Sequence, residues 1–265
     1  MDTSLTKEEI LSHIEAHHWD HEAELIPPYI DFVNNEKVIM IKNPYSSSIN
    51  ANKVVKFDAE QRTDQEIDHV LAFFGESPFS WWVGPSSKPA DLVERLEKKG
   101  FKMIDRYIGL AYPIDRWIEK HRDSPFEFKE ALSEKDVQHH VNVSAEVWGY
   151  DSASAKTAFE QRCEYIEAPF RRGGFMVALD NGKGIAHSNY RYSEDGTVLY
   201  LNGSAVLPSY RNKGIYSQLV FQRLNEAKVR GCKLVTCQAR EGTSEPILRK
   251  IGFNEYGVYI QMARV

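Results

Sequence analysis

An internal repeat is the feature of this sequence that most constrains its fold. The segments 96–111 (LEKKGFKMIDRYIGLA) and 248–263 (LRKIGFNEYGVYIQMA) align without a gap at a separation of 152 residues, and seven of their 16 positions are identical. Chance would give about one identity, so the repeat favours two copies of one fold. The alternative is two unrelated helix–glycine–strand units, because glycine commonly ends a helix.

The length of the chain agrees with two domains. A chain of 265 residues makes one large domain or two small ones. Hydrophobic residues make up 42% and charged residues 27%, which is ordinary for a globular protein and excludes wholesale disorder. A charged, polar stretch at 115–125 ends in proline and is typical of a connector between the two copies.

Charge and cysteine content restrict the partners and the compartment. The formal net charge of −5 argues against binding nucleic acid by bulk electrostatics. No apolar stretch is long enough to span a membrane, and the first ten residues lack the apolar core of a secretory signal. Cys163, Cys232 and Cys237 show no CxxC spacing, so we expect reduced thiols. We therefore expect a cytoplasmic protein, monomeric or homodimeric, that binds neither nucleic acid nor membrane.

Hydrophobic periodicity and turn residues predict the secondary structure. We expect a first helix, capped by Thr3 or Ser4 and ended by Pro27-Pro28, and then helices at 64–74, 89–99, 133–148, 153–168, 213–230 and 244–250. Strands are expected at 37–41, 79–84, 103–114, 126–131, 174–180, 184–192, 197–206, 233–239 and 255–263. The three strands within 174–206 predict an antiparallel meander whose first turn is Asn-Gly. The fold class is therefore α/β (α+β).

The segment 204–224 (SAVLPSYRNKGIYSQLVFQRL) carries the chemistry. A strand ends, Pro208 breaks it, and a helix begins at the sequence RNKGIY. The first N–H groups of a helix have no partner within it, and together with the helix dipole they attract a pyrophosphate. Gly214 allows close approach to the backbone, and Arg211 and Lys213 add positive charge. The alternative is a surface turn with two solvated basic residues.

The helix that follows has a recognisable apolar stripe. Its periodicity places Leu219 and Leu224 inward, and we expect Gln218 and Arg223 to face outward.

These residues resemble a known family. The pattern R-x-x-G-x-[GA] after a strand, a proline and an aromatic residue is similar to the acetyl-CoA signature of the GNAT N-acetyltransferase superfamily. The element order of 126–265 and the LRKIGF sequence at 248–253 fit the same family. The first copy keeps KKGF but contains no R-x-x-G-x-G. The chain thus resembles tandem GNAT proteins, with a degenerate domain at 1–118 and an acetyl-CoA-binding domain at 124–265, each a twisted, mixed, mostly antiparallel sheet flanked by helices.

The resemblance implies acetyl-CoA as cosubstrate, no metal, and a role for each matching residue. The backbone of Ala205 and Val206 is expected to pair with the pantetheine amides, as an added strand would. Gln238 and Ala239 are expected near the thioester. The pyrophosphate is expected among Arg211, Asn212, Lys213, Gly214, Ile215, Tyr216 and Ser217.

The chain departs from the family pattern at three positions. Tyr216 stands where glycine or alanine is usual. Leu248 stands where family members often place the tyrosine that protonates the leaving thiolate, and Glu241 replaces the usual asparagine seven residues earlier. Three readings stay open: another group donates the proton, the thiolate leaves unassisted, or the copy is impaired.

Three residues are candidate acid–base groups, since an ammonium substrate must lose a proton before it attacks a thioester. They are Glu241 after the strand 233–239, Glu146 near the end of the helix 133–148, and His187 within a strand. A solvated carboxylate or a buried sheet histidine is the alternative for each. Tyr256 and Tyr259 are candidates for the missing phenol, and packing in the core is the alternative for each.

Two further patterns have structural explanations. His13, His17 and His21 recur every four residues, a spacing that suits a metal on one helix face, but no second element offers matching ligands. Trp81-Trp82 and Trp148 are candidates for a wall of the acceptor pocket, and packing in the core is the alternative for them.

The sequence therefore predicts an acetyl-CoA-dependent N-acetyltransferase. Its acceptor would be the primary amine of a small molecule or peptide, which attacks the thioester directly. The alternatives are a non-catalytic module that binds acyl-CoA or a partner, and an acyltransferase for another acyl chain.

Overall fold

The computed structural model describes residues 5–120 and 123–264, and it divides into two compact units. Unit 1 consists of Met1–Leu110, Gln238–Arg249 and Asn254–Val265, and unit 2 of Ala111–Cys237 and Lys250–Phe253. The C-terminal strand thus belongs to the unit built mainly from the first half of the chain. The ranges 1–118 and 124–265 describe the sequence repeat rather than these contacts, and as domain boundaries they stay a prediction.

Unit 1 is a mixed sheet with helices. Its elements are α1 (Lys7–Ala16), η1 (Ala23–Leu25), β1 (Asp31–Asn34), β2 (Val38–Lys42), β3 (Lys53–Phe57), α2 (Thr63–Phe74), β4 (Ser80–Val83), α3 (Leu92–Lys98), β5 (Phe101–Pro113, whose last three residues belong to unit 2) and β11 (Asn254–Arg264). The strands lie in the order β1-β2-β3-β4-β11-β5. β1, β2 and β3 pair antiparallel, β3 pairs with β4 in parallel, and β4 pairs with β11 antiparallel.

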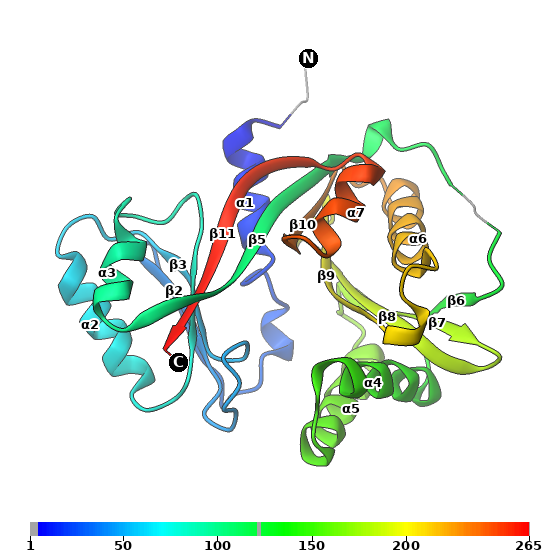
Figure 1. Ribbon diagram of the computed structural model, residues 1–265, viewed down its shortest axis with the longest axis horizontal. Helices are drawn as coiled ribbons and strands as arrows, with labels where there is room; N and C mark the ends of the chain where they lie inside the picture. The colour runs from blue at the N-terminus through cyan, green and yellow to red at the C-terminus, as the bar shows by residue number, and fades with distance from the viewer. Residues whose placement is uncertain (1–4, 121–122, 265) are drawn as a thin grey trace. The chain divides into compact units, whose positions relative to one another are not determined.

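Unit 2 repeats this plan. Its elements are η2 (Ile114–Arg116), β6 (Glu127–Glu130), α4 (Glu134–Trp148), α5 (Ser152–Glu167), β7 (Gly173–Asp180), β8 (Lys183–Tyr192), β9 (Val198–Val206), η3 (Pro208–Tyr210) and α6 (Ile215–Val229). β10 (Leu234–Arg240) and α7 (Ser244–Ile251) begin in one unit and end in the other. The order is β10-β9-β8-β7-β6, with β9 and β10 parallel and the other pairs antiparallel. Figure 1 shows α4 and α5 on one face of this sheet and α6 on the other.

The two units share one topology, as the sequence repeat predicts. In each, a three-stranded meander is followed by a helix and a strand parallel to the last strand of the meander. The repeated segments form α3 with β5 and α7 with β11. Gly100 and Gly252, which end the two helices, both have a positive φ, and the phenylalanine after each glycine is buried. The predicted α/β (α+β) class and the mostly antiparallel sheets are confirmed.

The cores differ in composition. Unit 1 is filled by aromatic rings: Phe74 stacks on Phe79 with centroids 4.0 Å apart, and Trp81 meets Phe57 and Phe101 edge to face. Unit 2 has aliphatic clusters on both faces of its sheet. Ile185, Ile215 and Leu219 pack between the sheet and α6, while Val143, Ala205 and Leu207 pack beneath α4. This second cluster fixes the end of β9 against α4.

Several predicted boundaries in unit 1 are wrong. The first helix ends at Ala16 rather than at Pro27. Its cap is Thr6, which accepts from the N–H of Glu9 in a capping box, whereas Thr3 and Ser4 lie outside the described residues. α3 begins at Leu92 rather than Pro89, because the preceding Lys88 is held extended by backbone hydrogen bonds to Phe57 and Ala59. The short strands β1 and β3 were not expected.

Candidate functional site

The chain makes a sharp turn between β9 and α6. β9 ends at Val206, the short helix η3 follows, and Gly214 precedes α6 in the left-handed conformation, with φ 77° and ψ 4°. No side chain caps α6. The first N–H groups of the helix are therefore available to a ligand, and the helix dipole favours an anion there. We call the segment Arg211–Ser217 the cradle.

The charges around the cradle favour an anion too. Arg211 and Lys213 are exposed, and within the described residues neither forms an ion pair with a carboxylate. Arg211 Nε donates to Val206 O at 3.3 Å, and Lys213 Nζ lies 4.6 Å from the centroid of the Tyr210 ring. The Tyr210 hydroxyl donates to Asp180 at 2.8 Å, which anchors the loop to the sheet. Two positive charges that no described carboxylate pairs with therefore lie at a helix N-terminus.

The end of β9 offers unpaired backbone beside the cradle. Its parallel register with β10 covers only Val198–Tyr200 against Leu234–Thr236, although β9 continues to Val206. On its other side β9 is paired, with Ala205 opposite His187 and Val206 opposite Ala186. Within the described residues, no strand therefore pairs with this edge of β9 around Ala205 and Val206, where Val206 O accepts only from Arg211 Nε, and the edge can take an added chain with amide groups.

Tyr216 stands in the first turn of α6. Its side chain is half-buried, and burial raises the pKa of the phenol, as does the neighbouring Cys237 thiol, while the Arg223 guanidinium acts in the opposite sense. The phenol therefore stays protonated at neutral pH. Tyr216 can occupy the signature position because a helical residue needs no positive φ there.

The prediction that Gln218 and Arg223 face outward is wrong, because both are buried. Arg223 is 2% exposed; its Nε donates to Leu219 O and its Nη1 to Asn189 O, both at 3.0 Å. Its Nη2 has no hydrogen-bond partner within the described chain. Periodicity misplaced Arg223 because a guanidinium can enter a core where backbone carbonyls accept its protons.

His187 belongs to a buried polar chain that the sequence analysis did not foresee. Its Nε2 lies 2.9 Å from Ser144 Oγ, which lies 3.5 Å from His140 Nδ1, and His140 Nε2 lies 2.6 Å from Asn189 Oδ1. The imidazole centroids are 3.8 Å apart. Burial lowers the pKa of His140 to about 3 and holds that of His187 well below its usual range. The spacing of His140 and Ser144, four residues apart on α4, was the available signal.

Two of the three candidate acid–base groups, Glu146 and His187, lie in unit 2 and do not converge, and the third, Glu241, lies in unit 1. Glu146 is exposed on α4, whereas Ser144, two residues earlier, faces inward to His187. Two residues turn a helix by about 200°, so Glu146 and His187 lie on different sides of α4. Glu241 lies in unit 1, exposed, and its carboxylate accepts from Arg106 Nη1 at 2.5 Å. A catalytic role for each stays a prediction.

The other residues expected near the thioester have defined surroundings in unit 1. The Gln238 amide lies 3.0 Å from His18 Nε2 and donates to Ile14 O at 3.3 Å, and Ala239 is buried. Leu248 is fully buried. Tyr259 fills the space left by two glycines, Gly84 and Gly109, as the core-packing interpretation expects, and Tyr256 is half-buried. Trp148, in unit 2, is 42% exposed and lies over Gly203.

The histidines of the first helix do not share a helix face. α1 ends at Ala16, so His17 and His21 lie beyond it, and a ring nitrogen of each contacts a backbone carbonyl, of Ile14 and His18 respectively. Across residues 5–120 and 123–264, no group of three or more His, Cys, Asp or Glu side chains is placed to hold a metal ion. No described helix has the length and apolar character needed to cross a membrane.

The topology and the cradle define a protein of the GNAT fold, and comparison with known proteins agrees. Residues 142–253 match the model of the acetyltransferase (GNAT) family. No curated protein matches the chain.

Solved structures show the same fold over nearly the whole chain. A GCN5-related N-acetyltransferase from Kribbella flavida has a TM-score of 0.67 at 14% identity, with 96% of this chain and 95% of that chain covered. A tandem GNAT protein from the clavulanic acid biosynthesis pathway has a TM-score of 0.64 at 12% identity, with 94% and 86% covered. A GNAT acetyltransferase from Colwellia psychrerythraea has a TM-score of 0.55 at 13% identity, with 99% and 98% covered. The resemblance to tandem GNAT proteins is thereby confirmed at the level of fold.

Proposed function

We propose that the protein is an acetyl-CoA-dependent N-acetyltransferase that acts on the primary amine of a small molecule or peptide. The observation that carries this proposal is the cradle itself. An uncapped helix N-terminus follows Gly214, carries two exposed basic side chains without carboxylate partners, and adjoins an unpaired edge of β9. A pyrophosphate, with an amide-containing arm attached, satisfies both features at once.

Acetyl-CoA would be bound by backbone groups and by basic side chains. The N–H groups of Ile215, Tyr216 and Ser217 would receive the pyrophosphate, and Arg211 and Lys213 would neutralise it. The amides of pantetheine would pair with Ala205 and Val206. These contacts are mainly to the backbone, so they require the conformation of the turn more than particular side chains.

The reaction would be a direct transfer. The neutral amine attacks the thioester carbonyl, a C–N bond forms, the C–S bond breaks, and CoA leaves as a thiolate. The amine gives up a proton to a base, with Glu241, Glu146 and His187 as the candidates, and the thiolate takes up a proton from solvent or from a protein acid. Leu248 cannot supply that proton. The fixed positions of donor and acceptor would lower the barrier chiefly by orientation.

Titration calorimetry of acetyl-CoA into the protein tests the cradle. We expect one site per chain with a micromolar Kd, abolished in Gly214→Trp because the indole would fill the turn. Gly196→Trp is the matched control, since Gly196 also has a positive φ and open space around it but lies at the other end of β9. Equal binding by both variants would show that acetyl-CoA does not use the cradle.

A second candidate is a module that binds acyl-CoA without turnover. It is favoured by the buried Leu248 at the usual position of the acid and by the ion pair between Glu241 and Arg106. Release of CoA measured with a panel of amines separates the two functions. Binding that Gly214→Trp abolishes, with no CoA released by any amine, would identify the module.

The acceptor and the acyl chain are proposed from charge and family. A net charge of −5 favours a cationic amine over an anionic acceptor. Acetyl-CoA is the proposed donor, and an activity profile over acetyl-, propionyl- and longer acyl-CoA would reveal a preference for another chain. We further propose that the protein acts in the cytoplasm as a monomer or homodimer.

A further inference from the structure

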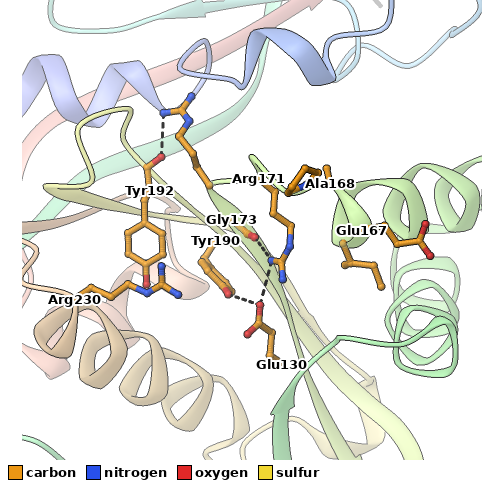
Figure 2. A pocket seen from close by; sticks show the side chains of 11 residues that line it. Glu130, Glu167, Ala168, Arg171, Gly173, Tyr190, Tyr192 and Arg230 are labelled. Carbon is orange, nitrogen blue, oxygen red and sulfur yellow. Dashed lines mark hydrogen bonds and ion pairs between the residues drawn. The ribbon is translucent and has the colours of Figure 1, made fainter.

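Unit 2 contains a cavity of about 400 Å³ well away from the cradle. It opens where β6 and α5 end, β7 begins, and β8 and α6 end. The lining residues are Glu130, Ile166, Glu167, Ala168, Pro169, Arg171, Arg172, Gly173, Tyr190, Tyr192 and Arg230 (Figure 2). α6 has 15 residues, with the cradle at its first turn and Arg230 just after its last. A helix of that length spans about 22 Å, so the cavity and the cradle are separate sites.

Two consecutive glycines give the cavity its shape. A Cβ on Gly173 would lie 2.2 Å from the carbonyl oxygen of Tyr190. One on Gly174 would lie 2.8 Å from both a Glu130 carboxylate oxygen and the Tyr190 hydroxyl. The sequence RRGG at 171–174 therefore places two arginines beside two strand residues that have no side chains, and polar groups of the neighbouring strands lie in the space above them.

One side of the cavity has hydrogen-bond donors without acceptors. Tyr192 is 6% exposed, and within the described residues its hydroxyl has no hydrogen-bond partner. The Arg230 guanidinium lies 4.6 Å from the Tyr192 ring centroid. Its Nε donates to Glu226 at 2.7 Å, and in the described chain its terminal N–H groups have no acceptor. Figure 2 shows the Tyr192 hydroxyl and the Arg230 guanidinium close together.

On the opposite side of the cavity, the Glu130 carboxylate already accepts hydrogen bonds from its neighbours. Arg171 Nη1 donates to Glu130 at 3.3 Å and to Gly173 O at 2.5 Å, and the Tyr190 hydroxyl donates to Glu130 at 2.8 Å. Arg172 donates to Tyr192 O at 3.3 Å. Glu167 also lines the cavity, and in Figure 2 its carboxylate lies on the side away from Arg230 and Tyr192. Glu130 thus has its donors, whereas within the described residues the Tyr192 hydroxyl and the terminal N–H groups of Arg230 have no acceptor.

We propose that this cavity binds a small oxyanion, the carboxylate or phosphate group of a ligand, through the Arg230 guanidinium and the Tyr192 hydroxyl. A planar guanidinium presents paired N–H groups that match two oxygens of a carboxylate or phosphate, and charge-assisted bonds of this kind are the strong ones. The buried phenol adds a neutral donor at fixed geometry. The Arg171–Glu130–Tyr190 network holds the opposite wall and leaves its carboxylate neutralised. A volume of about 400 Å³ admits a metabolite-sized ligand.

The proposal is tested by titrating inorganic phosphate and, separately, malonate into the full chain at constant ionic strength. Because the cradle also attracts anions, each anion is titrated into the wild type and into Gly214→Trp, and the variants below are compared in the Gly214→Trp background. We expect saturable binding of at least one anion, weakened at least tenfold by Arg230→Gln and several-fold by Tyr192→Phe, since each removes a bond to a charged group. Arg116→Gln, which removes an exposed arginine elsewhere in unit 2, is the matched control and should leave binding unchanged.

The outcomes are distinct from those of the acetyl-CoA experiment. Preference for phosphate or malonate identifies which oxyanion the site accepts. Binding that is present in the wild type but absent in the Gly214→Trp background would place the anion in the cradle and overturn the proposal. Saturable binding unchanged by both Arg230→Gln and Tyr192→Phe, or absent for both anions, would overturn it as well. Tyr192→Phe is nearly isosteric, so it keeps the test valid if Arg230→Gln destabilises the fold.

Discussion

Arg62 and Gly214 hold equivalent positions in the two units, 152 residues apart, and share one backbone conformation. Each precedes the helix that follows the meander, α2 in unit 1 and α6 in unit 2. Both are left-handed, with φ 59° at Arg62 and 77° at Gly214, and neither helix has a side-chain cap. Unit 1 has therefore kept the turn and lost the glycine that suits it.

The residues before these two positions explain how the copies differ. Unit 2 has Arg211 and Lys213 ahead of its helix, whereas the corresponding residues of unit 1 are Ala59 and Gln61, with Glu60 between them. A carboxylate repels an anion at a helix N-terminus, and Arg62 is the one basic residue within 59–62, against two in 211–214. This difference supports the proposal that only the second copy holds acetyl-CoA.

Arg62→Gly should stabilise the protein without creating a second cofactor site. A residue with a Cβ is strained in the left-handed region, and glycine relieves that strain at some entropic cost, so the free energy of unfolding should rise by roughly 0.5–1 kcal/mol. Urea unfolding measures the gain. Calorimetry with acetyl-CoA should still give one site per chain. A stoichiometry of two would mean that the glycine alone had kept unit 1 from binding.

Much of this architecture was predictable because its signals are local. The helix–glycine–strand repeat, the Asn-Gly hairpin and the RNKG turn each depend on a few adjacent residues, and each forms as expected. The strands β1 and β3 were missed because they are only four and five residues long and their pattern resembles that of loops. Their place is decided by pairing with β2, which sequence periodicity does not report.

Buried polar groups were harder to foresee than the fold. His140, Ser144 and Arg223 are buried because partners on other elements accept or donate their hydrogen bonds. Those partners lie dozens of residues away in the sequence, so a helical pattern alone assigns such side chains to solvent. The same reason explains why the cavity at Arg230 was not predicted: it is assembled from the ends of five elements.

The His140–His187 pair should make the fold sensitive to acid. Because the folded-state pKa of His140 is lowered to about 3, the unfolded chain binds a proton that the folded chain excludes once the pH falls below about 6.5. The contribution of the neutral, buried His140 to the free energy of unfolding is complete above about pH 7 and decreases as the pH falls. At pH 5 the free energy of unfolding should be lower by about 2 kcal/mol from His140 alone. Urea unfolding at both pH values measures the loss.

The variant His140→Gln isolates the contribution of His140 to the pH dependence of stability. His140→Gln retains a donor for Asn189 but does not titrate. Between pH 5 and 6 the free energy of unfolding should therefore fall less steeply with decreasing pH in the variant, by an amount that corresponds to at most one proton bound on unfolding. His69→Gln, which removes an exposed histidine, is the control. An identical slope in wild type and His140→Gln would mean that the buried histidine is not responsible.

Leu248→Tyr should destabilise the protein and leave the turnover of folded enzyme unchanged. Leu248 is fully buried, so a phenol there overpacks the core at a cost of about 1–3 kcal/mol and would not reach a thiolate in this packing. Leu248→Met, which conserves volume, is the control and should cost less. The measurements are thermal unfolding and CoA release. A gain in kcat would show instead that the site lacks only the acid that this position usually supplies.

The ion pair of Arg106 with Glu241 allows the proposed base to be separated from a structural carboxylate. Both side chains are 44% exposed, so breaking the pair should change stability by less than about 1 kcal/mol. If Glu241 takes the proton of the amine, Glu241→Gln should lower kcat about 100-fold while the Kd for acetyl-CoA stays the same. Arg106→Gln removes the partner but keeps the carboxylate, so it should change kcat far less. Equal losses in the two variants would mean that the pair only positions the loop, and an unchanged kcat in Glu241→Gln, with a loss in Glu146→Gln, would move the base to α4.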